Sequence, residues 1–438
     1  MRWLFIVLLI PAVAYSQQWQ GFNMPLSYNN AYTSFYDSIN QKLYVVGDYR
    51  PDNVMNHNHV CFYNGIKWDT LPGIFANRTI AVTAYNNEIY IGGYFEEVNG
   101  IPSRGLVKWN GYSFEYFGNR LNQSVTMLKV IDDKLLVGGG FSLADSIHVS
   151  GLAWYDGINF IPLPLNSYNL FQPFDAVKFD SMLIITGNID DTLNYNIVCL
   201  KDGEWIDFPA GGIQGSDAAI ADAEIFDNKL YVGGYFYKSW GNAGNFIQYF
   251  DGTSWKDVCG GTSYFPNSTE NAQVHCLKVH KGKLYAGGLF NYAGDIPAHR
   301  LAVWDGSKWC GFGTSFNEIG RVFSIEFYKD TMFVFGNFST INGIQTLSVA
   351  KWLGGDYVDT CSQPYSVPEN NFDNSLIIYP NPCLDILSIE VSYEKIDDLK
   401  FEVYDITGKL IISQNNKEYV GTAIKYIDFS FLSKGIYM

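Results

Sequence analysis

The chain has 438 residues, of which 47% are hydrophobic and 17% aromatic, and its formal net charge is −15 at pH 7. This length and apolar content are ample for a large core. No basic patch offsets the negative charge, which argues against nucleic acid and anionic membrane surfaces as partners. The 42 glycines and the many aromatic residues, with few helix-like patterns, predict an all-β protein.

Residues 1–16 have the pattern of a secretory signal peptide. Arg2 gives a positive start, residues 3–10 form an apolar core, and Ala14 to Ser16 form a small-x-small cleavage site. The apolar run is too short to span a bilayer as an anchor. We therefore expect cleavage before Gln17, and no later segment is apolar enough to be a transmembrane segment.

A repeated unit fills residues 17–360 and is clearest in residues 284–309. Each copy has an apolar strand that ends in glycine, a variable loop, a second apolar strand and a tight turn between aromatic residues. The copies recur every 45 to 54 residues, a period typical of propellers and solenoids. We predict a seven-bladed β-propeller with four strands in each unit. The first glycines are Gly47, Gly92, Gly138, Gly187, Gly233, Gly287 and Gly336, and the turns are Asn64-Gly65, Asn110-Gly111, Asp156-Gly157, Asp202-Gly203, Asp251-Gly252, Asp305-Gly306 and a degraded Gly354-Gly355.

Each part of the unit has a physical reason. Asn-Gly and Asp-Gly pairs supply the positive φ angles of a tight hairpin, and flanking aromatics such as Trp304 and Trp309 can pack across it. Glycine pairs inside a strand indicate close backbone approach. A unit of this kind buries both of its faces only by radial stacking. We expect the following phenylalanines to fill the space between neighbouring sheets: Phe95, Phe141, Phe236, Phe290 and Phe338.

In the clearest copy we predict strands at residues 274–279, 284–289, 300–304 and 308–312. Two closures of the ring fit the sequence: Trp19 to Phe22 resembles an outer strand and would complete the seventh unit, or Tyr357 and Val358 would complete it. The loops between the second and third strands vary most, and variable loops on a rigid scaffold are where binding is expected. These loops are residues 48–59, 96–104, 142–150 and 238–245.

The glycine-ended strand and the later aromatic pair resemble kelch-like propellers and galactose-oxidase-type central domains. The resemblance covers most of residues 17–360 and implies a fold. It does not imply a function, because no local motif identifies the tyrosine, histidine and cysteine ligands of a copper-radical oxidase. We therefore transfer no activity from this family.

Residues 361–375 read as a polar, proline-containing linker. Residues 376–438 then contain Pro380-Asn381-Pro382, a Val-x-Asp-x-x-Gly turn at residues 403–408 and Leu432 to Tyr437. These motifs, in this order, resemble the C-terminal sorting domain of the type IX secretion system of Bacteroidetes. The resemblance implies a small Ig-like β-sandwich that is recognised by the type IX secretion machinery, and a protein that is secreted or held on the outer-membrane surface. A plain accessory β-sandwich is the alternative. The family pattern continues past Tyr437, so we expect the domain to be truncated at Met438.

Seven cysteines leave at least one unpaired in an oxidising compartment. Cys61 and Cys199 lie in apolar strands at equivalent places and read as small core residues. Cys259 with Cys276, and Cys310 with Cys361, are candidate disulfides. No Cys-x-x-Cys pair supports a zinc or redox site.

The sequence identifies no catalytic, cofactor-binding or metal-binding residue, and the cofactor is unknown. His57 and His59 could offer two imidazoles, and the pairs Asp132-Asp133 and Asp190-Asp191 could offer carboxylates, but neither set has the spacing of a known metal site. Nucleophile-elbow and P-loop motifs are absent.

Three functions remain open. The chain is expected to be an exported, non-catalytic cell-surface or secreted binding or adhesion protein that contacts a glycan or a surface protein through its propeller loops. The alternatives are a secreted polysaccharide-acting hydrolase, lyase or oxidase with its site at the propeller axis, and a structural component of an extracellular matrix. A carboxylate or His/Tyr cluster converging on the axis would favour the enzyme.

Overall fold

The computed structural model describes residues 19–22, 30–48, 58–164, 169–190, 196–215, 218–264, 272–312, 316, 320–353, 375–379, 386–404 and 410–428. The predicted signal peptide, most of the predicted linker, His57, Asp191, Gly354-Gly355, Tyr357 and Val358 lie outside these residues. Trp19–Cys361 form one compact unit and Ser362–Met438 belong to a second. Within the described residues the secondary structure is antiparallel β-sheet with one short 3-10 helix, η1 (Lys238–Trp240), so the all-β prediction is confirmed.

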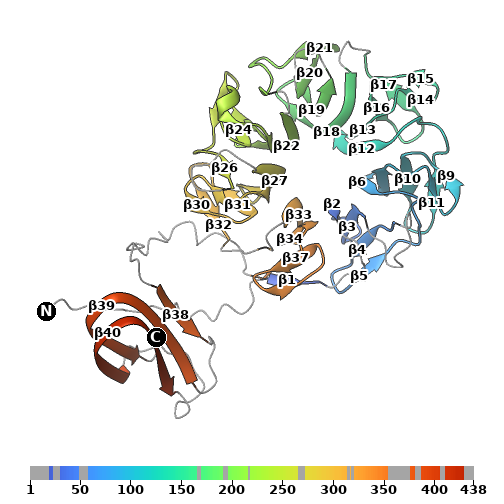
Figure 1. The fold of residues 1–438 in the computed structure, drawn as a ribbon. Coiled ribbons are helices and arrows are strands. Elements are labelled where there is room, and N and C mark those ends of the chain that lie inside the picture. Colours follow the sequence, from blue (N-terminus) through green and yellow to red (C-terminus); the bar gives the residue numbers. More distant parts are fainter. Residues whose placement is uncertain are drawn as a thin grey trace. The chain divides into compact units, whose positions relative to one another are not determined.

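Seven four-stranded antiparallel sheets follow one another in the described part of Trp19–Cys361 (Figure 1). We number them in chain order and give each from its inner strand outwards. The first three are β2 (Ala31–Asp37), β3 (Lys42–Gly47), β4 (Cys61–Tyr63) and β5 (Trp68–Thr70); β6 (Thr79–Tyr85), β7 (Glu88–Gly93), β10 (Leu106–Trp109) and β11 (Phe114–Tyr116); and β12 (Val125–Ile131), β13 (Lys134–Gly139), β16 (Leu152–Tyr155) and β17 (Phe160–Pro162).

The remaining sheets have the same order of strands, and short hairpins connect some of their second and third strands. The fourth to seventh sheets are β18 (Asn169–Phe179), β19 (Met182–Asp190), β20 (Ile197–Lys201) and β21 (Glu204–Asp207); β22 (Ala219–Phe226), β23 (Lys229–Tyr235), β24 (Ile247–Phe250) and β25 (Trp255–Asp257); β27 (Gln273–His280), β28 (Lys283–Leu289), β31 (Leu301–Trp304) and β32 (Trp309–Gly311); and β33 (Arg321–Tyr328), β34 (Thr331–Asn337), β37 (Val349–Trp352) and β1 (Trp19–Gly21). The short pieces are β8 (Glu97–Val98) with β9 (Ile101–Pro102), β14 (Leu143–Ala144) with β15 (Ile147–His148), β26 (Thr262–Ser263) with β29 (Tyr292–Ala293) and β30 (Ile296–Pro297), and β35 (Thr340–Ile341) with β36 (Ile344–Gln345).

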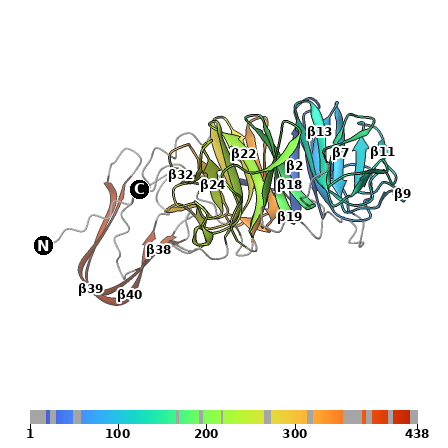
Figure 2. The same cartoon turned by 90° about the horizontal axis from the view of Figure 1, so that it is seen from above.

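The seven sheets form a ring (Figure 1). Each inner strand contacts the inner strand of the next sheet, from β2 through β6, β12, β18, β22 and β27 to β33, and β33 contacts β2 again. Seven hydrophobic clusters of described residues lie between consecutive sheets, including one between the seventh and the first. Seen edge-on in Figure 2, the strands run between the two faces of the ring. The stability of this unit therefore depends on contacts between sheets, since no sheet covers its own faces.

The N-terminal strand closes the ring. β1 pairs antiparallel with β37, and Trp19 lies opposite Trp352 with the two ring centroids 5.0 Å apart. Phe22 then stacks on Phe333 and contacts Trp68 of the first sheet, at 6.0 Å in each case. Of the two closures that fitted the sequence, the one through Trp19 to Phe22 is confirmed.

A β-bulge lies at the same place in every inner strand, opposite the glycine motif. In the sixth sheet, Val274 and Cys276 flank the bulge and pair with Gly288 and Gly287. A Cβ on Gly288 would lie 2.0 Å from a carbonyl oxygen of β27, and one on Gly287 would lie 2.6 Å from a valine of β33. The predicted close approach is confirmed, with one glycine facing its own inner strand and the other facing the next sheet.

The bulge pairing corrects the alignment of the repeats. Gly288, the second glycine of its pair, lies opposite the residue just before the bulge. Three glycines that the sequence assigned to the first position have this same pairing and therefore correspond to the second position: Gly47, Gly187 and Gly336. The first position holds a larger residue in these three sheets. Those residues are Val46, Thr186 and Phe335.

In the outer turn of the sixth sheet, the glycine and the preceding aspartate have different roles. Gly306 has φ of 100°, as predicted, whereas Asp305 accepts hydrogen bonds through Oδ1 from the N–H groups of Ser307 and Lys308, at 2.8 Å each. The acidic residue thus caps the turn. The aromatic pair that flanks this turn is confirmed, because the rings of Trp304 and Trp309 lie 5.3 Å apart. The predicted interleaving phenylalanines Phe95, Phe141, Phe236, Phe290 and Phe338 are all buried.

One disulfide prediction is wrong. Cys259 and Cys276 are both free, since Cys276 is buried on the inner strand β27 and Cys259 is exposed just after the outer strand β25. Cys61 and Cys199 are free and buried, as expected of core residues. Cys310 is disulfide-bonded, and its partner lies outside the described residues.

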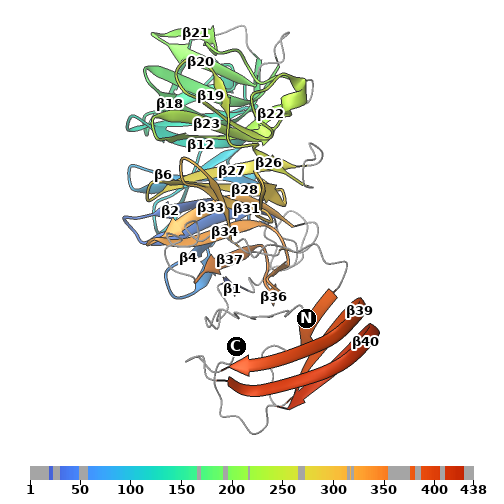
Figure 3. The same cartoon turned by 90° about the vertical axis from the view of Figure 1, so that its left-hand side faces the viewer.

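The C-terminal unit contains three antiparallel strands in the order β38 (Ser375–Tyr379), β39 (Ile386–Tyr404) and β40 (Leu410–Asp428). The two long strands, β39 and β40, lie side by side in Figure 3. Ser375 begins a strand and so does not belong to the predicted linker. Most residues of the three sorting motifs, including Pro380 to Pro382 and Leu432 to Tyr437, lie outside the described residues. Across the described part of the chain, none of the helical structure is long and apolar enough to cross a membrane.

Candidate functional site

Four of the seven inner strands carry a polar side chain directly after the bulge, and three of these side chains connect neighbouring sheets. Asp175 accepts a hydrogen bond from the N–H of Ala223 at 3.2 Å, and Asp222 accepts one from the N–H of Leu277 at 2.6 Å. At the closure of the ring, Oγ of Ser324 accepts one from the N–H of Ser34 at 3.2 Å. Each bond therefore fastens one inner strand to the next.

A set of charged side chains, which we call the axial cluster, surrounds the contacts made by Asp175 and Asp222. Lys129 lies 2.7 Å from Asp175, and Lys278 lies 2.9 Å from Glu326. The lysine side chains are 37% and 33% exposed, whereas both carboxylate side chains are 9% exposed. The axial cluster comprises Lys129, Asp175, Asp222, Glu224, Lys278 and Glu326, from the inner strands β12, β18, β22, β27 and β33.

Two carboxyl groups of β22 have perturbed acidities. Removal from water and the neighbouring charge of Asp175 raise the pKa of Asp222 well above its ordinary value, and its carboxyl hydrogen-bonds to that of Asp175. Removal from water also raises the pKa of Glu224, although Lys129 opposes this shift. For Lys129, desolvation lowers the pKa but the carboxylates of Asp175 and Asp222 outweigh it, so the net shift is upward. The cluster can therefore hold protons on carboxyl groups above their usual range.

Replacing Asp222 with asparagine should stabilise the protein at neutral and alkaline pH. The folded-state pKa of Asp222 is raised, so its contribution is fully present below the unfolded-state pKa and is lost as pH rises through the folded-state pKa. Asparagine imitates the protonated carboxyl: its oxygen can accept from Leu277 and its amide can donate to Asp175. The difference in free energy of unfolding should grow by about 1.4 kcal/mol per pH unit between the two pKa values.

Urea unfolding of both proteins from pH 4 to pH 9 checks this prediction. Asp295→Asn, an exposed substitution of the same chemistry, is the control and should change the free energy of unfolding by less than about 0.5 kcal/mol. An Asp222→Asn variant that is less stable than the parent at every pH would contradict the assignment.

Aromatic side chains occupy the bulges beside the axial cluster. The ring of Phe323 lies 5.8 Å from Tyr32 and 5.0 Å from His275, and Phe174 is 39% exposed. Nε2 of His275 is buried and has no hydrogen-bond partner among the described residues. Burial, with the positive charge of Arg321, lowers the pKa of His275 to about 4, so this imidazole is neutral at pH 7.

The sequence-based metal candidates are not brought together. Asp132 and Asp133 form the turn after β12, where Asp132 pairs with Lys178. Asp190 ends β19, and His59 lies between the third and second strands of the first sheet, so these residues belong to different sheets. No group of three His, Cys, Asp or Glu side chains within the described residues could hold a metal ion.

Two of the four predicted variable loops form short hairpins at one face of the ring, and residues 49–57 of the first loop lie outside the described residues. Residues 96–104 contain β8 and β9, residues 142–150 contain β14 and β15, and residues 238–245 contain η1. Because these loops connect second to third strands, they lie at the face where the inner strands begin, which we call the loop face. Three hairpins expose an isoleucine at equivalent places: Ile101 is 45% exposed, Ile147 45% and Ile296 41%.

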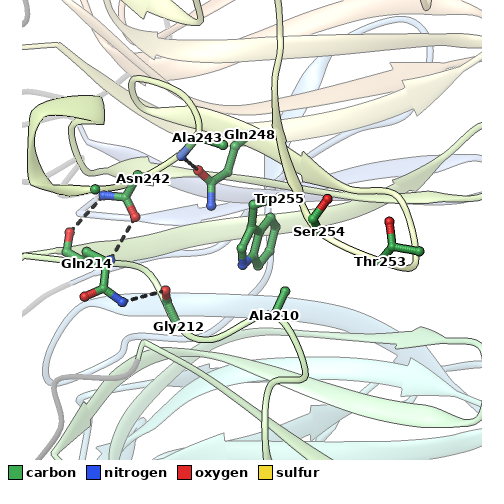
Figure 4. Close-up of a pocket in the computed structure, with 10 residues that line it drawn as sticks. Ala210, Gly212, Gln214, Asn242, Ala243, Gln248, Thr253, Ser254 and Trp255 are labelled. Carbon is green, nitrogen blue, oxygen red and sulfur yellow. Dashed lines mark hydrogen bonds between the residues drawn. The ribbon is translucent and has the colours of Figure 1, made fainter.

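A cavity of about 340 Å³, which we call the rim cavity, lies beside the outer half of the fifth sheet (Figure 4). The segment between β21 and β22, the connection between β23 and β24, and the turn before β25 line it. None of its lining side chains is ionisable. They belong to Ala210, Gly212, Gln214, Gly241, Asn242, Ala243, Gln248, Thr253, Ser254 and Trp255.

Residues 377–438 match a family model described as a secretion system C-terminal sorting domain. This match implies export by type IX secretion, an interaction with its machinery, and a secreted or cell-surface location. No curated protein matches the chain. A crystal structure of the computationally designed Ika8 protein is similar over 75% of this chain and 97% of that one, with 11% identity and a TM-score of 0.40.

Proposed function

We propose that the chain is an exported surface protein that binds a partner through the loop face of a seven-bladed, kelch-like β-propeller. In this proposal a signal peptide at residues 1–16 starts export, residues 17–360 form the propeller, a linker follows, and an Ig-like sorting domain at residues 376–438 completes delivery. The family match at residues 377–438 supports the export step. The ring of seven inter-sheet clusters supports the propeller.

The proposal of binding rests on the exposed isoleucines of the loop face. They lie on connections between second and third strands, and variable loops on a rigid scaffold are where binding is expected. Ile101, Ile147 and Ile296 each follow a two-residue turn and belong to the second strand of a hairpin. A rigid ring that presents such hairpins on one face is suited to adhesion, because little conformational entropy is lost on binding.

The axial cluster favours a second candidate, a secreted enzyme acting on polysaccharide. Asp222 and Glu224 are carboxyl groups of raised pKa beside lysines, which is the arrangement that general acid catalysis uses. Glu224→Gln would abolish hydrolysis or elimination of a polysaccharide substrate if this candidate were correct, and would leave adhesion unchanged if binding through the loop face is the function.

The proposal is tested with a triple variant in which Ile101, Ile147 and Ile296 become lysine. Purified parent and variant are applied to a glycan array and to whole cells of the producing species. We expect saturable binding by the parent and at least about a tenfold loss of affinity in the variant, equivalent to about 1.4 kcal/mol.

A matched control carries the same substitution at three isoleucines on the opposite face of the ring. Ile39, Ile66 and Ile158 lie in turns after first or third strands and are 73%, 89% and 73% exposed. This control should bind like the parent protein. Equal loss in both variants, or loss in neither, would count against the loop face as the binding surface.

A further inference from the structure

The rim cavity has a fixed and uncommitted hydrogen-bond donor. Gln248 is 1% exposed, and its Oε1 accepts hydrogen bonds from the N–H groups of Ala243 at 3.0 Å and Gly244 at 3.3 Å. These two bonds hold the side-chain amide in one orientation. Its Nε2 amino group has no partner among the described residues, and in Figure 4 it points into the space between Asn242 and Trp255. An amide N–H group held in one orientation at the wall of a cavity can donate to a ligand or water that enters it.

The walls of the cavity are held in place by other bonds. Asn242 accepts from the N–H of Gln214 at 2.8 Å and donates through Nδ2 to the carbonyl oxygens of Gln214 and Tyr237, at 2.9 Å each. The indole N–H of Trp255 donates to Gly211 at 3.0 Å, and its ring stacks on Phe208 with the centroids 5.0 Å apart. The cavity is therefore preorganised, which lowers the entropic cost of binding.

The side chains that line the rim cavity indicate which class of ligand it can bind. The cavity has no ionisable side chain to balance a charged ligand, and its volume of about 340 Å³ is in the range of small-molecule sites. The ligand must offer an acceptor to Gln248 Nε2 and can donate to Oε1 of Gln214, whose Nε2 is already bonded to the carbonyl of Gly212. Hydroxyl groups do both, and the half-buried indole of Trp255 offers an apolar edge to the C–H groups of a sugar ring.

We propose that the rim cavity binds one neutral sugar unit of a surface or matrix glycan, with Gln248 Nε2 as the central donor. This assignment rests on the proposed function of surface binding and gives it a ligand class. Asn242 and Gln214 lie on connections that belong to the loop face, whereas Thr253 and Ser254 lie in the turn at the opposite face, so the cavity opens on the outer rim between the two faces.

Isothermal titration of the full chain tests the proposal with five neutral hexasaccharides: cellohexaose, xylohexaose, mannohexaose, maltohexaose and chitohexaose. Gln248→Glu keeps an oxygen for Ala243 and Gly244 but replaces the donor with an acceptor. Ala210→Phe fills the cavity and leaves the hydrogen bonds of Gln248 intact. It therefore tests sugar binding by the cavity even if Gln248→Glu folds poorly. Gln345→Glu is the matched control, because Gln345 is exposed on β36, far along the chain from the cavity.

We expect one of the five sugars to bind saturably, with affinity falling at least about tenfold in Gln248→Glu and Ala210→Phe and unchanged in Gln345→Glu. Binding that survives both cavity variants overturns the cavity assignment while leaving surface binding intact. Failure of all five sugars overturns the sugar assignment. If the loop-face isoleucines still mediate binding to cells in that case, the proposed function stands without it.

Discussion

Replacing Trp19 with alanine is expected to lower the free energy of unfolding of the ring by about 3–5 kcal/mol, the range for truncating a buried tryptophan. Trp19 is 0% exposed and its ring meets that of Trp352 edge-on at 5.0 Å. Its indole N–H has no hydrogen-bond partner among the described residues. The loss is therefore one of packing, and it falls on the strand that closes the ring.

The position of Trp19 makes this variant more damaging than its equivalents. Trp19 faces Trp352 as Trp68 faces Tyr63 and as Trp309 faces Trp304, but the other pairs belong to continuous hairpins. Detachment of β1 leaves β37 as an open edge and uncovers the cluster between the sixth and seventh sheets. The first and seventh sheets then remain joined by their inner strands and the cluster between them, so the ring is weakened at its closure.

Guanidinium unfolding monitored by tryptophan fluorescence, together with limited proteolysis, measures the effect. Trp68→Ala is the control, since this residue is only half-buried and its strand stays tethered by the Asn64-Gly65 turn. We expect a smaller loss of stability in Trp68→Ala. Early proteolytic cleavage near the pairing of β1 with β37 should occur only in Trp19→Ala. Equal losses in the two variants would mean that β1 does not hold the ring closed.

The sequence predicted the elements of the ring because each is encoded locally. In the sixth sheet the predicted strands at residues 274–279, 284–289, 300–304 and 308–312 differ by at most one residue at each end from β27, β28, β31 and β32. The repeat of glycine, turn and aromatic residues fixes the hairpins. Alignment on the first glycine nevertheless failed in three sheets, because the bulge makes the second glycine the invariant one: its Cβ would strike the backbone of its own inner strand.

The axial cluster could not be predicted in the same way. Lys129, Asp175, Glu224, Lys278 and Glu326 come from different repeats, and only the shared bulge register places them beside one another. Each looks like an ordinary polar residue of an alternating strand. A signal did exist, since aligning the repeats on the bulge puts Asp175 and Asp222 at one position and Lys129, Glu224, Lys278 and Glu326 at another.

The rim cavity could not be predicted from the sequence, for a related reason. Gln248 belongs to β24, and its orientation depends on hydrogen bonds to the loop that precedes the strand. Gln214 comes from the connection after the fourth sheet and meets Asn242 across the sheet boundary. Long-range contacts of neutral amides leave no pattern of charge or spacing in a single sequence, so neither residue was singled out as a site.

Deleting residues 377–438 should abolish export to the cell surface and the medium in a host with type IX secretion. These residues carry the sorting-domain match, and they belong to a compact unit separate from Trp19–Cys361. Because the ring has its own hydrophobic clusters and its own closure at β1 and β37, it should fold without them. The truncated protein is therefore expected to accumulate, folded, in the periplasm.

Cell fractionation and immunoblotting of the parent and truncated proteins measure this effect, and a reciprocal fusion separates sorting from folding. Residues 361–438 attached to a monomeric red fluorescent protein with a signal peptide should carry it out of the cell, and a host lacking the type IX machinery should retain it. A truncated ring that still reaches the medium would show that the export signal lies outside residues 377–438. A ring that is degraded in the periplasm would show that the two units depend on each other for folding, contrary to the division of the chain into separate cores.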